Sequence, residues 1–119
     1  MMVDDASILL FSYGTLQDPQ VQLANYGRLI QGEADALPGY ALVPLVIEDA
    51  HIIAVSGKNV HMIARPTGNP GDRVAGTLLF LTTDELEASD GYEEQAYTRV
   101  RETLESGRLA FVYTGEAAA

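Results

Sequence analysis

The stretch Ile8-Leu9-Leu10-Phe11-Ser12-Tyr13-Gly14-Thr15-Leu16 decides how this chain folds. Its apolar first half predicts a strand over 8–12, and Tyr13-Gly14 predicts a tight turn at the end of that strand. Asp18-Pro19 then supplies a helix N-cap residue followed by proline at the first helical position. We therefore expect a short helix from Pro19 to Tyr26, which Gly27 is well placed to end.

The rest of the chain alternates short apolar runs with turn residues. Further strands are predicted over 41–47, 51–55, 60–65, 74–81, 97–104 and 109–113. Pro44 favours an edge or bulge position for the first of these strands. Thr82 and Glu85 have the spacing of a capping box, which predicts a second short helix over 83–89. Many short strands with two short helices indicate an α+β fold built on a barrel-like or strongly curved sheet.

Length and composition limit the classes of protein to consider. The 119 residues fit a single domain over 1–119, with an ordered core expected over about 7–114. Seventeen acidic residues against seven basic ones give a net charge of −10, which disfavours nucleic acid and anionic membrane surfaces as partners. No apolar run approaches the roughly 20 residues that a membrane span needs. We expect a cytoplasmic protein, since the N-terminal segment Met1 to Asp5 carries two acidic residues and no basic one, and cysteine is absent.

The chemistry-bearing residue types are few. The two histidines, His51 and His61, lack a metal-ligand spacing and are interpreted as ordinary strand histidines. Ser12 lacks the glycine-flanked elbow of a serine nucleophile. We therefore expect neither a metal nor a cofactor.

The segment Tyr13-Gly14-Thr15-Leu16 is the first candidate site. A strand that ends in a glycine turn exposes consecutive backbone N–H groups, and such groups bind carboxylates and oxyanions. The alternative is an ordinary connection between a strand and a helix.

The second candidate site lies in Asp90-Gly91-Tyr92-Glu93-Glu94-Gln95-Ala96-Tyr97-Thr98-Arg99, interpreted as a loop between a helix and a strand. Tyr92 and Tyr97 flank Glu93, and partial desolvation by their rings would suit a carboxylate that transfers protons. The alternative is a solvated acidic loop in an acidic protein.

Together, these two segments resemble the gamma-glutamylcyclotransferase-like (AIG2-like) family. The family's first motif, Tyr-Gly-Thr/Ser-Leu after an apolar strand, matches residues 10–16. Its second motif matches Asp90, Tyr92, Glu93, Tyr97 and Arg99, and the closing Phe111-Val112-Tyr113 resembles the family's last strand.

The resemblance implies a small mixed β-barrel with one pocket at its mouth. It implies an enzyme in which Tyr13, Gly14, Thr15 and Leu16 bind the glutamyl part of a small gamma-glutamyl amine or peptide. Glu93 matches the catalytic general acid/base, and the substrate's own amine attacks its γ-carbonyl to release 5-oxoproline. Two alternatives stay open: a binding module for a small metabolite without catalysis, and another transferase or lyase that uses the same pocket.

Overall fold

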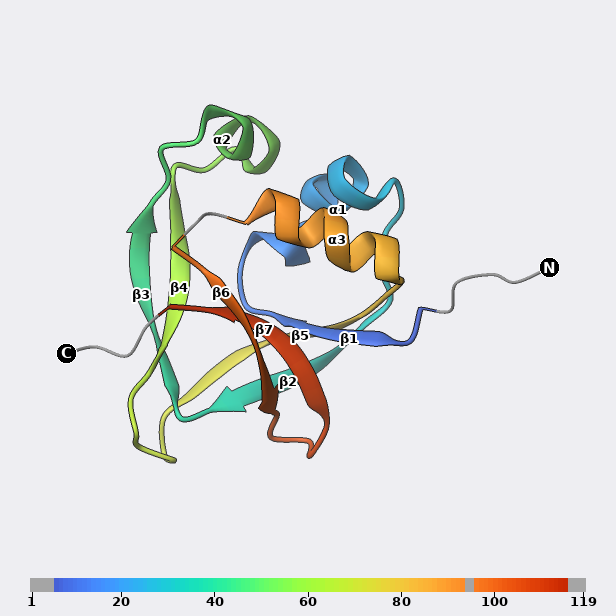
Figure 1. Ribbon diagram of the computed structural model, residues 1–119. Coiled ribbons are helices and arrows are strands. Elements are labelled where there is room, and N and C mark those ends of the chain that lie inside the picture. Colours follow the sequence, from blue (N-terminus) through green and yellow to red (C-terminus); the bar gives the residue numbers. More distant parts are fainter. Residues whose placement is uncertain (1–5, 94–95, 116–119) are drawn as a thin grey trace.

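The computed structural model describes residues 6–93 and 96–115, which form one curled mixed sheet with helices packed at one end of it (Figure 1). The strands are β1 (Ile8–Ser12), β2 (Gly32–Pro38), β3 (Tyr40–Val46), β4 (Val60–Pro66), β5 (Arg73–Leu81), β6 (Thr98–Thr103) and β7 (Leu109–Thr114). The helices are the 3-10 helix η1 (Thr15–Gln17) and the α-helices α1 (Pro19–Tyr26), α2 (Ala50–Ser56) and α3 (Thr83–Tyr92). The predicted α+β class with a small, barrel-like mixed sheet is confirmed.

The order of the strands places β1 in the interior of the sheet, between β5 and β7. The sheet runs β2-β5-β1-β7-β4-β3, and β6 forms a hairpin with β7. β1 is antiparallel to β5 but parallel to β7, with Leu10 beside Phe111 and Phe11 beside Val112. Because parallel neighbours end at the same edge of a sheet, the residues that follow β1 lie beside the end of β7.

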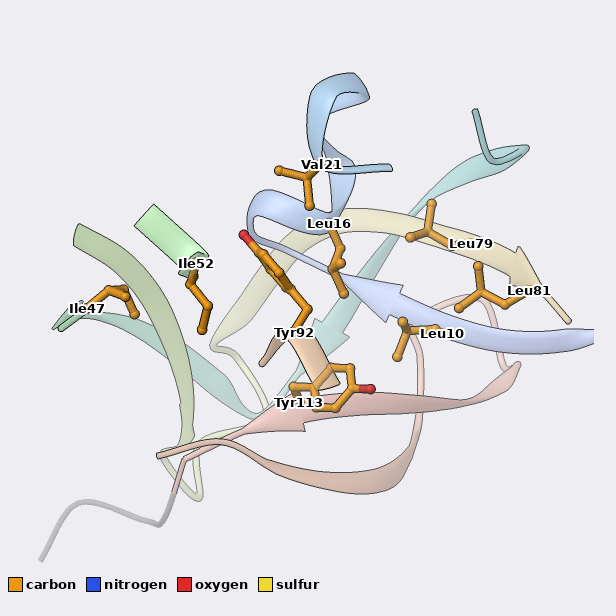
Figure 2. Packing of buried hydrophobic residues seen from close by; sticks show 9 residues of the cluster. All are labelled: Leu10, Leu16, Val21, Ile47, Ile52, Leu79, Leu81, Tyr92 and Tyr113. Carbon is orange, nitrogen blue, oxygen red and sulfur yellow. The ribbon is translucent and has the colours of Figure 1, made fainter. Parts of the chain in front are cut away.

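Side chains of β1 belong to two separate hydrophobic clusters, because successive side chains of a strand point to opposite faces. Leu10 joins the cluster under the helices, which Figure 2 shows together with Leu16 of η1, Ile52 of α2 and Tyr92 of α3. Phe11 joins the cluster on the opposite face, beneath the β6–β7 hairpin. Both clusters therefore hold β1 in place from its two faces.

Several local predictions are confirmed. β1 and α1 have the predicted bounds, and Gly27 ends α1 with a left-handed φ of 72°. β3 lies at the edge of the sheet, as Pro44 indicated, and Thr82 and Glu85 form both hydrogen bonds of a capping box. The Asp18 side chain, however, makes no capping hydrogen bond and instead pairs with Lys58.

The predicted strand over 51–55 is wrong, because this segment is helix α2. The Asp49 carboxylate accepts hydrogen bonds from the backbone N–H groups of His51 and Ile52, which is the N-cap arrangement. Gly57 closes the helix with a φ of 73°. His51 is therefore an exposed residue on a helix and not a strand histidine.

The interpretation of residues 90–92 as loop is also wrong, because α3 extends to Tyr92, three residues beyond the predicted end. Glu93 is the C-cap residue, with extended backbone angles, and its N–H donates to the Ser89 carbonyl at 3.1 Å. Glu94 and Gln95 lie outside the described residues. Within the part of the chain that is described, no helix is long and apolar enough to cross a bilayer.

Candidate active site

A pocket of about 330 Å³, counting the space open at its mouth, lies where β1 ends beside β4 and β7. Residues 11–16 supply one continuous stretch of its lining. The other described lining residues are His61, Met62, Glu93, Tyr97 and Tyr113. The pocket thus joins the end of β1, the start of β4, the end of α3 and the end of β7.

The hydroxyl of Tyr13 ties the strands around the pocket together. It donates a hydrogen bond to the Tyr113 carbonyl at 2.5 Å and accepts one from the Ala64 N–H at 2.9 Å. β7 and β4 are neighbours at this point, since Ala64 pairs with Thr114. Because its proton is already donated to the protein, Tyr13 can offer a ligand its ring and backbone but not this O–H.

The backbone after Tyr13 forms a turn that leads directly into η1. The first hydrogen bond within η1 runs from the Gln17 N–H to the Gly14 carbonyl at 3.1 Å. The amides of Thr15 and Leu16 therefore have no carbonyl partner within that helix. The Gln17 side chain also donates to Gly14 and accepts from Thr77 of β5, which fixes the turn against the sheet.

A side-chain contact joins this turn to α3. The hydroxyls of Thr15 and Tyr92 lie 2.8 Å apart, within hydrogen-bonding distance. Tyr92 is 2% exposed, and its ring packs in the cluster of Figure 2 beside Leu16. Tyr92 was predicted to flank Glu93, but it is not among the described lining residues, and its role is to connect two walls of the pocket.

Asp90 holds the last turn of α3 against the sheet. One oxygen of its carboxylate accepts a hydrogen bond from the Tyr113 hydroxyl at 2.6 Å, and the other pairs with Arg99 of β6 at 2.5 Å. Glu93 follows three residues later and is half-buried in the pocket wall. The Asp90 and Arg99 positions of the sequence motif thus anchor the helix end that carries Glu93.

The negative charge of Glu93 also acts on two tyrosines of the pocket. Burial raises the pKa of the Tyr13 hydroxyl, and the negative charge of Glu93 raises it further. The pKa of Tyr113 is raised by burial, then by its hydrogen bond to Asp90 and by the charges of Asp90 and Glu93. These hydroxyls therefore stay protonated at neutral pH and act as hydrogen-bond donors.

Positive charge is scarce in this lining. The described lining residues include neither lysine nor arginine. His61 is buried, and its Nε2 lies 3.1 Å from the Ser56 hydroxyl of α2. Over residues 6–93 and 96–115, no group of three or more His, Asp or Glu side chains is arranged to hold a metal ion.

The pocket brings together all five residues singled out from the sequence, Tyr13 to Leu16 and Glu93. The functional role of each stays a prediction. The sequence did not indicate His61, Met62 or Tyr113 as lining residues, because they depend on β4 and β7 lying next to β1. The Tyr113 position had a signal in the closing Phe-Val-Tyr of the last strand.

A family model described as gamma-glutamyl cyclotransferase, AIG2-like, matches residues 10–118. The chain belongs to this family. The matched region contains both sequence motifs and every described residue of the pocket lining. No curated protein matches the chain.

Solved structures share the fold of this AIG2-like protein. A protein from Arabidopsis thaliana with a solution structure is 21% identical, with a TM-score of 0.67 over 97% of this chain and 71% of its own length. A gamma-glutamyl cyclotransferase is 14% identical, with a TM-score of 0.68 over 92% of this chain and 67% of its own. An uncharacterised protein from Pyrococcus horikoshii is 18% identical, with a TM-score of 0.62 over 92% and 78%. At these identities, the likeness shows a common fold.

Proposed function

We propose that this protein is a gamma-glutamyl cyclotransferase that releases 5-oxoproline from a small gamma-glutamyl amine or peptide. The observation that supports this most is the position of Glu93, which lines the same pocket as the turn over Tyr13 to Leu16. A carboxylate able to move protons and a set of amides able to bind an oxyanion are the two groups that this reaction needs.

In the proposed complex, the turn binds the glutamyl part of the substrate. The amides of Thr15 and Leu16 point their hydrogens at the γ-carbonyl oxygen, on which negative charge develops during the reaction. The Ser12 hydroxyl is a further lining group that can hydrogen-bond the α-carboxylate. Because the Gln17 side chain holds the turn, these donors need little reorganisation when charge develops.

Glu93 carries the proton between the two nitrogens. Its carboxylate takes a proton from the substrate's α-ammonium group, and the free amine attacks the γ-carbonyl carbon to form a C–N bond and a tetrahedral oxyanion. At this stage the ring nitrogen still carries two hydrogens. Glu93 gives its proton to the departing nitrogen, and the oxyanion collapses as the original amide C–N bond breaks. The ring nitrogen then loses its second proton through Glu93 to the released amine, so the products are 5-oxoproline and an ammonium ion, and Glu93 is again a carboxylate.

No enzyme nucleophile is required, because the substrate carries its own. The pocket contributes by holding the amine close to the carbonyl, and orientation of this kind is worth up to about 7–11 kcal/mol in the most favourable intramolecular reactions. Asp90 anchors the end of α3, and the Thr15 hydroxyl contacts that of Tyr92. In the proposed site, these two contacts keep Glu93 and the oxyanion-binding turn at a fixed separation.

The proposal is tested by incubating the protein with a panel of gamma-glutamyl amines and peptides and measuring 5-oxoproline by mass spectrometry. Formation of 5-oxoproline with an equal amount of free amine is the expected result. A different product from the same substrates would indicate another transferase or lyase. Saturable binding without turnover across the panel would indicate a binding module, and the proposal would be wrong.

A further inference from the structure

The lining of the pocket also indicates where the departing amine would lie, an argument that depends on the proposed function. If the glutamyl part occupies residues 12–16 and Glu93 reaches the nitrogen that leaves, the rest of the lining contacts the leaving group. The Tyr113 hydroxyl is committed to Asp90, and the buried His61 side chain contacts Ser56 of α2. Phe11 is buried in the cluster beneath the β6–β7 hairpin, which leaves Met62 and Tyr97 among the described lining residues.

Met62 is the inner end of an exposed apolar strip. Met62 lies beside Pro44 across the β3–β4 pair, and Val60 lies beside Val46. Alternation places these four side chains on one face. Val46 is 67% exposed, Val60 46% and Met62 37%. We call these four residues the apolar strip. Of the four, Met62 is a described lining residue of the pocket, and the strip runs from it along β3 and β4. Adjoining exposed apolar residues of this kind mark binding surfaces.

Tyr97 gives this side of the pocket a fixed aromatic wall. Its hydroxyl donates to the Met62 carbonyl at 2.7 Å, and the half-buried ring packs against the cluster under the helices. An aromatic ring and a flexible methionine in one lining suit apolar groups of varied shape.

The described residues on this side of the pocket carry no permanently cationic side chain. Neither lysine nor arginine is among the described lining residues, and the whole chain carries a net charge of −10. A leaving amino acid would bring its own carboxylate to this surface without a cationic partner, whereas an alkyl or aryl amine would bury apolar area against Met62 and Tyr97.

We propose that the apolar strip and Tyr97 form the leaving-group subsite, which selects gamma-glutamyl amides of apolar amines over those of anionic amino acids. Met62 is the residue that sets this selectivity, because it belongs both to the pocket and to the strip.

The test measures kcat/KM for 5-oxoproline release from gamma-glutamyl methyl-, ethyl-, propyl- and butylamide and from gamma-glutamylglycine. We expect kcat/KM to rise about two- to fourfold with each added methylene. The butylamide should exceed gamma-glutamylglycine by at least about tenfold. Equal values along the alkyl series, or a preference for gamma-glutamylglycine, would overturn the proposal while leaving the proposed reaction intact.

Two variants assign the effect to Met62. Met62→Ala should lower the ratio of butylamide to methylamide kcat/KM about three- to tenfold, and Met62→Lys should raise the activity on gamma-glutamylglycine. Leu109→Ala, an exposed apolar residue on β7, is the matched control and should leave the ratio unchanged. A ratio of two substrates is independent of how much of each variant is folded. An unchanged ratio in Met62→Ala would contradict the assignment.

Failure of the proposed function gives a different result, namely no 5-oxoproline from any member of the series. The same amides are therefore also titrated as ligands by calorimetry. Affinity that rises with alkyl length in the wild type, and less steeply in Met62→Ala, would support the subsite in a protein without turnover. Affinity independent of alkyl length would overturn it.

Discussion

The Tyr113 hydroxyl donates a 2.6 Å hydrogen bond to the Asp90 carboxylate, and this contact joins the end of β7 to the last turn of α3. The same carboxylate pairs with Arg99 of β6. Glu93 lies less than one helical turn beyond Asp90, so its position in the pocket depends on this contact. Asp90 and Arg99, two residues of the second sequence motif, thus hold the helix end that carries Glu93, a third residue of the same motif.

Replacement of Tyr113 by phenylalanine should affect both stability and turnover. Tyr113→Phe removes one hydrogen bond to a charged group, which should lower the free energy of unfolding by about 1–2 kcal/mol. It also loosens the α3 end, so kcat should fall about tenfold while KM changes little. Urea denaturation and steady-state kinetics measure the two effects.

Tyr40→Phe is the matched control, because Tyr40 also donates to a carboxylate, that of Glu102, but belongs to the opposite cluster and is not among the described lining residues of the pocket. Tyr40→Phe should lower the free energy of unfolding about as much as Tyr113→Phe does, and it should leave kcat unchanged. Equal kcat in the two variants would show that the Tyr113–Asp90 bond does not position Glu93.

Gly76 of β5 should not tolerate a side chain. A Cβ at this position would collide with the Ser12 carbonyl oxygen and lie 2.8 Å from Phe11 Cζ. Gly76→Ala should therefore destabilise the protein by about 1–3 kcal/mol, the usual cost of overpacking. Gly91→Ala on α3 meets open space and should stabilise by about 0.5–1 kcal/mol through helix propensity. Thermal unfolding distinguishes the two variants. Equal changes in their unfolding temperatures would be inconsistent with the close approach of β5 to β1.

The protein should lose stability in alkaline solution. Burial raises the pKa values of Tyr13, Tyr26, Tyr40, Tyr92 and Tyr113, that of Tyr26 to about 12. The unfolded chain releases these protons near pH 10, so above that pH the unfolded state binds fewer protons than the native state. The contribution of the protonated tyrosines to stability is fully present below about pH 10. It is lost as the pH rises toward 12 and above. Unfolding temperatures followed with tyrosinate absorbance test this, and a flat profile up to about pH 12 would contradict it.

Local signals in the sequence predicted much of this fold. The glycine turn after β1, the Asp18-Pro19 start of α1 and the Thr82–Glu85 capping box each act within a few residues, so no tertiary information was needed. The error at α2 has a clear cause. His51 to Val55 is rich in β-branched residues and favoured a strand, but the Asp49 cap and Gly57 close a helix, and Ile52 then packs against the cluster under the helices.

The candidate site was predictable only in part. The turn over Tyr13 to Leu16 and the segment around Glu93 carry motifs that can be identified in the sequence. Met62 and Tyr113 join them only because β7 pairs in parallel with both β1 and β4, and parallel pairs connect segments that are distant in the chain. The continuation of α3 to Tyr92 was missed because Gly91 and the acidic residues around it favoured a loop.

Glu93 is proposed to transfer the proton in 5-oxoproline release, and the Glu93→Gln variant is the decisive test of that role. This change keeps the size of the side chain and removes the base. We therefore expect kcat/KM on the best substrate of the panel to fall about 10²–10⁴-fold, while the unfolding temperature stays the same. Glu87→Gln, an exposed neutralisation on the same helix, should keep full activity. A Glu93→Gln protein that is folded and releases 5-oxoproline as fast as the wild type would contradict the account.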